Sequence, residues 1–228
     1  MIYEIKKKVY TAAPVNFAET ARYACAKTAD ERLIGLIESC ARESEAENAV
    51  NYSVCYAVTP LNLNEDVADF SAFSLKSKNL VTALGGATAA LVFACTLGVK
   101  FDRLIKKYSE INPSRALVFQ ALGAERVETF TDLFLAEYEK ETGVTLTPRF
   151  SPGYGDLPLS AQRELFALLN PQKHLGLTLN DSLLMSPSKS VTAIAGVKKT
   201  CGTNETGETN GGERSCKNCT AINCGFRR

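Results

Sequence analysis

The chain is nearly devoid of histidine, and this shortage excludes several kinds of catalytic site. Its 228 residues contain a single histidine, His174, which we interpret as a strand-end residue. No metal site with two or more histidines can be built, and we expect no Ser-His-Asp triad. A GxxxxGK[ST] phosphate loop is also absent, and Gly153-Tyr154-Gly155-Asp156 lacks the third glycine of a GxGxxG motif. We therefore do not expect nucleotide hydrolysis or Rossmann-type NAD binding.

Excess charge and long apolar runs are missing as well. The formal net charge is +1, so the chain lacks the clustered Lys/Arg excess of a nucleic-acid surface. The longest apolar run, Leu84 to Leu97, is too short to span a bilayer. Met1 to Val9 contains Glu4 and three lysines and does not read as a secretion signal. We expect a cytoplasmic protein that contacts neither nucleic acid nor membrane.

The cysteines fall into two groups. The chain has eight, which in a cytoplasmic protein indicate buried thiols or a metal site more than disulfides. Four are scattered through apolar segments and are predicted to be inert core thiols: Cys25, Cys40, Cys55 and Cys95. The other four crowd the C-terminal stretch of Gly, Asn and Thr. We therefore divide the chain into a main domain, 1–198, and a Cys-rich tail, 199–228.

The tail cysteines have the spacing of metal ligands. They are Cys201, Cys216, Cys219 and Cys224, and the middle two form a Cys-x2-Cys pair. Such a tail has too few apolar residues to build a core, so a bound metal would supply its ordering free energy. Tetrahedral zinc and an iron–sulfur cluster both suit this spacing, and a disordered tail with free thiols is the third reading.

The hydrophobic pattern predicts an α+β fold, a mostly antiparallel twisted sheet wrapped by several helices. The apolar run 89–96 has no polar alternation and is typical of a buried strand. Further strands are expected at 2–10, 52–58, 70–75, 144–150, 174–179 and 190–197. Helices are expected from about Pro14, from a capping box at Thr28 to Glu31, and over 77–84, 99–108 and 159–169.

One long central helix is predicted from Pro113 to about Glu141. Proline is favourable in the first turn of a helix. One face is expected to pack inward through Leu117, Ala121, Ala124, Val127, Thr131 and Phe134. Glu128 lies on or beside that face. From the pattern alone it is a rim carboxylate paired to Lys or Arg.

A loop rich in proline and glycine, Arg149 to Pro158, follows the expected strand 144–150. Its two prolines and two glycines cannot continue a helix or a sheet ladder, so we expect fixed turns with outward peptide groups. Arg149 adds a planar charged fork suited to a carboxylate, and Tyr154 adds an aromatic face. A structural turn with an exposed arginine is the alternative interpretation.

This loop, with the segment Leu177 to Val191, resembles the activation domain of cobalamin-dependent methionine synthase. The loop matches that family's Arg-x-x-Pro-Gly-Tyr motif through Arg149, Pro152, Gly153 and Tyr154. The later segment matches its Leu-Thr-x-Ser-x-x-Met-x-Pro-x-x-Ser-Val pattern in order, and from Ser182 to Val191 also in spacing. The resemblance covers residues 110 to 197 most firmly.

The resemblance implies a role in methyl transfer. In that family this domain binds S-adenosylmethionine and presents its methyl group to a cobalamin held elsewhere, so the cofactor does the difficult chemistry. Arg149 would then engage a polar end of the ligand, Ser151 would offer backbone contacts, Tyr154 would pack beside it, and Glu128 would lie near the pocket. The chain has no cobalamin-binding segment and would act in trans.

Two functions therefore remain open. The first is a stand-alone reactivation subunit for a split methionine synthase or another corrinoid protein, with electrons from a flavodoxin- or ferredoxin-type donor. The second is a docking, assembly or metal-cluster-bearing module that does not bind S-adenosylmethionine. The second is favoured by a departure from the family, whose later strand carries a ligand-side tyrosine where this chain has Ile194 or Ala195. A ligand-side aspartate near the family's N-terminus also has no secure counterpart.

Overall fold

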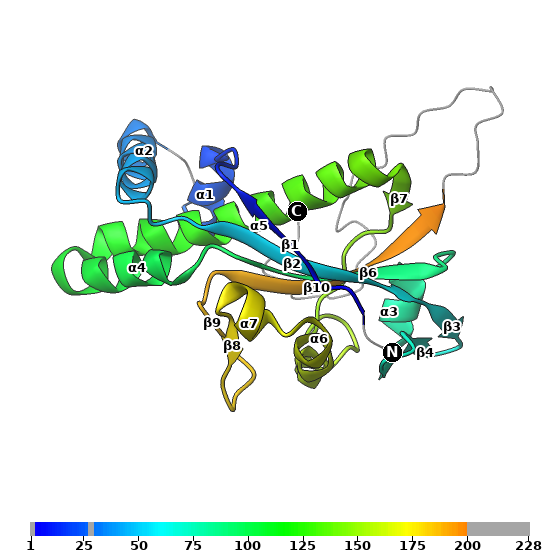
Figure 1. Cartoon of the computed structure of the whole chain (residues 1–228). Coiled ribbons are helices and arrows are strands. Elements are labelled where there is room, and N and C mark those ends of the chain that lie inside the picture. Colours follow the sequence, from blue (N-terminus) through cyan, green and yellow to red (C-terminus); the bar gives the residue numbers. More distant parts are fainter. Residues whose placement is uncertain (1–2, 27–29, 200–228) are drawn as a thin grey trace, which may run out of the picture.

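The computed structural model describes residues 3–26 and 30–199, and it places an antiparallel five-stranded sheet at the centre (Figure 1). The order of its strands is β1-β2-β6-β10-β7. Their bounds are β1 Lys6–Tyr10, β2 Tyr52–Pro60, β6 Ala89–Thr96, β7 Val144–Leu146 and β10 Ser190–Lys199. Two small sheets accompany it, made of β3 Asn62–Asn64, β4 Val67–Asp69 and β5 Ser74–Lys76, and of β8 Thr178–Leu179 and β9 Met185–Ser186. The α+β fold class is confirmed.

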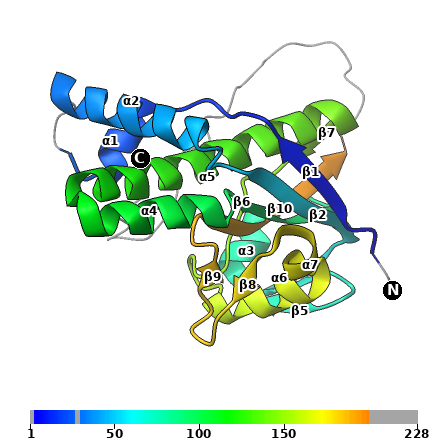
Figure 2. The ribbon, with the colours of Figure 1, turned by 60° about the vertical axis from the view of Figure 1, so that its left-hand side comes forward.

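Helices cover both faces of the central sheet (Figure 2). One face carries α1 Phe17–Tyr23, α2 Glu31–Ala46, α4 Val99–Ile111 and α5 Pro113–Thr142. The opposite face carries α3 Lys78–Ala83, the 3-10 turn η1 Leu159–Ala161, α6 Gln162–Leu169 and α7 Pro171–Leu175. Successive residues of a strand point to opposite faces, so β6 sends Phe93 to the α5 core and Val92 to the α6 core. Both residues are fully buried, which explains the uninterrupted apolar sequence of β6.

The long helix α5 begins and ends where its sequence signals lie. Asn112 caps its first turn by accepting a hydrogen bond from the Arg115 N–H, and Pro113 follows as the first helical residue. Gly143 ends the helix in the left-handed conformation, with φ of 66°. Other elements pack against the middle of α5 on several sides, so its buried residues extend beyond a single helix face. The prediction for Leu117 was wrong: its side chain is 56% exposed.

Several other local predictions need correction. The expected strand 70–75 is mostly the turn 70–73 that joins β4 to β5, and only its last two residues belong to β5. The expected strand 174–179 starts inside helix α7, because Asn170 caps that helix and Pro171 occupies its first turn. Only Thr178–Leu179 of that range is a strand, β8. Helix α2 is capped by Asp30, whose side chain accepts from the Leu33 N–H. Cys25 is exposed just after α1 with a positive φ of 58°, whereas Cys40, Cys55 and Cys95 are buried as expected.

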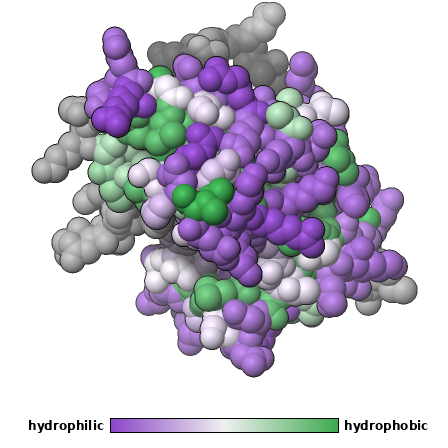
Figure 3. Space-filling view, turned by 90° about the vertical axis from the view of Figure 1, so that its left-hand side faces the viewer, coloured by the Kyte–Doolittle hydropathy of each residue, from purple (hydrophilic) through white to green (hydrophobic). Residues whose placement is uncertain are grey.

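The surface is mainly polar on the face of the molecule that Figure 3 shows. The face shown there is largely hydrophilic, and its apolar areas are small and separate. Within the described ranges, no helix combines the length and the apolar character that crossing a membrane requires.

Candidate functional site

Arg149 is positioned by a short pairing with β10. The N–H of Phe150 donates to the Ile194 carbonyl at 2.8 Å, and the Ile194 N–H donates to the Phe150 carbonyl at 2.9 Å. Thr147 adds two more bonds, because its N–H donates to the Gly196 carbonyl at 2.9 Å and its hydroxyl accepts from the Gly196 N–H at 2.8 Å. Phe150 packs into the α6 core, so its neighbour Arg149 turns to the α5 side.

On that side Arg149 meets two carboxylates of α5. Its Nη2 atom lies 2.7 Å from Oε2 of Glu128 and 3.1 Å from Oδ1 of Asp132. The two acids are four residues apart and therefore lie on one face of the helix. The structure thus brings together Arg149 and Glu128, two of the predicted site residues. It adds Asp132, which the sequence analysis missed although the four-residue spacing from Glu128 was a usable signal.

The Arg149 cluster is partly shielded from solvent. The exposed fractions of the side chains are 21% for Arg149, 31% for Glu128 and 42% for Asp132. Burial acts to lower the pKa of Arg149, but the charges of Glu128 and Asp132 outweigh it and the net shift is upward. The guanidinium is therefore permanently charged, and its fork can bind a ligand carboxylate if it exchanges one of these partners.

A buried thiol lies under this cluster. Cys95 of β6 is inaccessible to solvent, and burial raises the pKa of its thiol to about 12, although a hydrogen bond with Thr131 and the charge of Arg149 act in the opposite direction. A protonated thiol is a poor nucleophile. Cys95 is thus a core thiol and not a reactive group.

The loop after Arg149 is held by bonds within itself. The N–H of Gly153 donates to the Leu157 carbonyl at 2.9 Å, the N–H of Tyr154 to the Ser151 carbonyl at 3.3 Å, and the N–H of Leu157 to the Tyr154 carbonyl at 3.0 Å. These three donors serve the loop's own turns, which corrects the expectation that its peptide groups all face outward. Gly153 has φ of 90°, a conformation that L side chains rarely adopt.

Asp156 ties the loop to helix α3. Its carboxylate accepts from the Ser77 hydroxyl, from the Lys78 N–H at 2.8 Å and from the Asn79 N–H at 3.2 Å. The bond from Ser77 contributes most to lowering the pKa of Asp156, with the two backbone donors beside it. Gly155 permits the approach, since a Cβ atom there would lie 2.4 Å from the Asn79 side-chain nitrogen. The loop is therefore anchored at both ends.

The remaining predicted residues differ in exposure. Pro152 is buried and anchors the loop, whereas Ser151 is partly exposed and Gly153 is exposed. Tyr154 is 50% exposed, so part of its ring can contact a ligand. Aromatic rings with a polar tip commonly serve at such positions.

Among the described residues, the edge of β10 next to Arg149 has no neighbouring strand at Thr192, although Thr192 itself is only 3% exposed. Ile194 uses its N–H and C=O for the bridge to Phe150, and the same groups of Thr192 point to the same edge because alternate residues of a strand do so. Strand β7 pairs only with Val197 to Lys199, and Thr192 pairs with Ala94 of β6 on the other side of β10. Backbone hydrogen-bonding groups thus border the site. Ile194 and Ala195 are fully buried, so neither side chain replaces the family's tyrosine.

The predicted metal ligands lie elsewhere. Cys201, Cys216, Cys219 and Cys224 fall outside the described residues, so the metal site remains a prediction. Within 3–26 and 30–199, no group of three or more His, Cys, Asp or Glu side chains could hold a metal ion.

Comparison with known proteins gives a result at the level of fold. No family model matches the sequence, and no curated protein matches it. A solved structure does match, the "Crystal Structure of the MetH Reactivation Domain bound to AdoHcy", with a TM-score of 0.62 over 89% of this chain and 81% of that chain. The chain has the fold of the MetH reactivation domain. The sequence identity is 15%, so the resemblance stated from the Arg149 loop is confirmed as a resemblance of fold.

Proposed function

We propose that this chain is a stand-alone reactivation subunit that binds S-adenosylmethionine at the Arg149 site. It would support reductive methylation of the cobalamin in a split methionine synthase or another corrinoid protein. The observation that carries the proposal is the fold match to a reactivation domain bound to AdoHcy. The Arg149–Glu128 pair, adjoining a loop with that family's motif, supports it independently.

The charges of the site fit those of S-adenosylmethionine. That ligand carries a carboxylate, an ammonium and a positive sulfonium. Arg149 offers its guanidinium to the carboxylate, while Glu128 and Asp132 supply negative charge close by for the cationic groups. Ser151, Pro152 and Gly153 shape the turn, and Tyr154 offers a ring. The partner's cobalamin supplies the nucleophile when bound, so this chain needs only to bind and orient the methyl donor.

Two measurements test this function. Calorimetric titration with S-adenosylmethionine should show binding by the protein alone, and no heat at millimolar ligand would remove the proposal. The protein should then be mixed with cobalamin-loaded methionine synthase, S-adenosylmethionine and a reductant or a flavodoxin- or ferredoxin-type donor. Recovery of the methylcobalamin spectrum is expected, and an unchanged spectrum with each corrinoid partner would contradict the role.

A docking or assembly module for a corrinoid protein is the second candidate. The buried Ile194 and Ala195 favour it, because the family's ligand-side tyrosine has no replacement there. This candidate predicts association with the corrinoid protein in the absence of S-adenosylmethionine binding. Ultracentrifugation of the mixture beside the titration separates the two.

For the tail we propose a bound metal on Cys201, Cys216, Cys219 and Cys224. Their spacing supports zinc or an iron–sulfur cluster, and a cluster would suit a reductive role. Metal content and the visible spectrum of anaerobically purified protein distinguish them. A brown protein excludes zinc alone, and a colourless protein with zinc removes the cluster. Full metal retention in Cys219→Ala would contradict a site shared by the four.

A further inference from the structure

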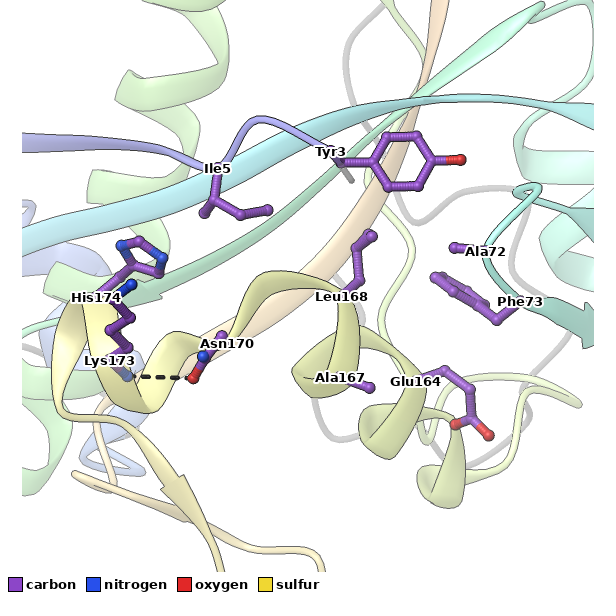
Figure 4. Close-up of a pocket in the computed structure, with 10 residues that line it drawn as sticks. All are labelled: Tyr3, Ile5, Ala72, Phe73, Glu164, Ala167, Leu168, Asn170, Lys173 and His174. Atoms are coloured by element: carbon purple, nitrogen blue, oxygen red, sulfur yellow. Dashed lines mark hydrogen bonds between the residues drawn. The ribbon is translucent and has the colours of Figure 1, made fainter. Parts of the chain in front are cut away.

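A pocket lies on the face of the sheet opposite Arg149. Its volume is about 630 Å³, within the usual range for small-molecule sites. The N-terminal segment, the β4–β5 turn and helices α6 and α7 line it (Figure 4). Ile5, Phe73 and Leu168 pack against the α6 core, whereas Arg149 faces α5. The pocket is therefore separate from the proposed S-adenosylmethionine site.

The middle of this pocket is apolar and firmly held. Phe73 stacks on the buried Phe70, with ring centroids 4.8 Å apart and an interplanar angle of 24°. The Tyr3 hydroxyl donates to the Phe70 carbonyl at 3.4 Å, which ties the N-terminal segment to the same turn. Ile5 and Leu168 complete the apolar surface. A flat or aromatic group can pack here without rearrangement of the backbone.

The two ends of the pocket carry opposite charge. Figure 4 shows Glu164 at the end near Phe73, and Lys173 with His174 at the other end. Oε2 of Glu164 is shielded from solvent, and no group within the described ranges donates a hydrogen bond to it. The carboxylate of Glu164 is therefore not fully compensated, and a positive charge arriving beside it is favoured. Lys173 and His174 offer donors to an anion.

We propose that this pocket binds an elongated zwitterion, with its ammonium at Glu164, an apolar body against Phe73 and Leu168, and its anionic group at Lys173 and His174. An α-amino acid carries both charges on one carbon and cannot reach both ends. The ligand class is therefore an ω-amino acid or a short peptide.

The test uses matched probes on the full chain. p-(Aminomethyl)phenylacetic acid carries both charges across an aromatic ring, p-tolylacetic acid lacks the ammonium, and p-methylbenzylamine lacks the carboxylate. Protein NMR shifts around Phe73, Leu168 and His174 report binding. We expect the zwitterion to bind about tenfold more tightly than p-tolylacetic acid, as one charge-assisted hydrogen bond allows.

Two variants assign that preference to the two ends. Glu164→Gln should abolish the preference over p-tolylacetic acid, and Lys173→Gln should reduce the preference over p-methylbenzylamine. Arg163→Gln, on an exposed position of the same helix, should change neither. Absence of shifts with all probes, or a preference that persists in Glu164→Gln with an otherwise unchanged spectrum, would overturn the proposal. The affinity for S-adenosylmethionine should be unchanged in all three variants. A negative result for this pocket can therefore be distinguished from a negative result for the proposed site at Arg149.

Discussion

Helix α5 carries two sets of charged contacts whose surroundings differ. In the inner set, Arg126 is 1% exposed and donates to the Tyr52 hydroxyl and, at 2.9 Å, to Oε1 of Glu45. Glu125 is fully buried and accepts from the Asn16 N–H at 3.0 Å and the Thr129 hydroxyl at 2.7 Å. These contacts connect α5 to α1, α2 and β2.

The outer set lies one turn further along the same helix. Glu128 and Asp132 meet Arg149 where the side chains keep contact with solvent. A charge enclosed on all sides cannot reach a ligand, whereas a charge at a rim can exchange its partner for a ligand. Charge type alone therefore does not identify a site, and accessibility decides between the two roles.

The largest expected effect comes from removing an inner residue. Arg126→Ala should lower the free energy of unfolding by about 3 kcal/mol, because it leaves a cavity and takes the partner from the Tyr52 hydroxyl. Urea unfolding measures this. Glu45→Gln is the control, since the Glu45 side chain is 62% exposed and should cost less than about 1 kcal/mol. Equal losses in both variants would contradict the distinction.

Removing the outer arginine should affect binding more than folding. Arg149→Ala should weaken S-adenosylmethionine binding by about 1.5–3 kcal/mol, the range for a hydrogen bond to a charged group. Its free energy of unfolding should change by less than about 1 kcal/mol, because the ion pair is partly solvated. Calorimetry and urea unfolding on one sample give both values. A larger effect on stability than on binding would place Arg149 in the inner set.

The two outer carboxylates should differ from each other. Glu128 lies nearer Arg149 and is less exposed than Asp132. Glu128→Gln should therefore weaken binding about tenfold, whereas Asp132→Asn should change it about twofold to threefold. Each variant removes one negative charge and serves as the control for the other. The same loss in both would mean that only the net charge of the cluster matters.

The smallest effect concerns pH and the inner carboxylate. Burial raises the pKa of Glu125, and the Thr129 and Asn16 donors only partly oppose it. A raised folded pKa gives stability that is present below the unfolded value and is lost as pH rises through the folded value. Glu125→Gln should therefore gain stability relative to the parent by about 1 kcal/mol or less between about pH 4 and pH 7. Urea unfolding across that range measures the gain.

Thr129→Val sharpens this pH test. This substitution removes a donor that lowers the pKa of Glu125. The variant should therefore lose stability with rising pH more steeply than the parent. Curves for the parent and both variants that run parallel across the pH range would contradict the assignment to Glu125.

Much of the fold could be predicted because its signals are local. Strand β6 is an unbroken apolar run, and α5 has Pro113 at its start and Gly143 after its end. Helix α7 was missed although Asn170-Pro171 is a start signal, since the apolar residues after it suggested a strand. The exposure of Leu117 depends on how α4 and α5 pack together, and a single-face pattern does not contain that information.

The candidate site was predictable in its residue types but not in its pairing. The motif identified Arg149, and the helix pattern placed Glu128 near an inward face. The contact between them depends on the bridge from Phe150 to Ile194, which joins segments far apart in sequence. The distinction between Glu125 and Glu128, both acids on one helix, likewise depends on how far α1 covers α5.

The anchoring of Asp156 bears on the thermodynamics of whatever binds beside Arg149. A loop with this content of glycine would lose conformational freedom on closing around a ligand. The three hydrogen bonds that Asp156 accepts and the turns within the loop impose that loss when the protein folds. The site is thus preorganised, and a ligand meets a shaped edge whose ordering does not subtract from its affinity.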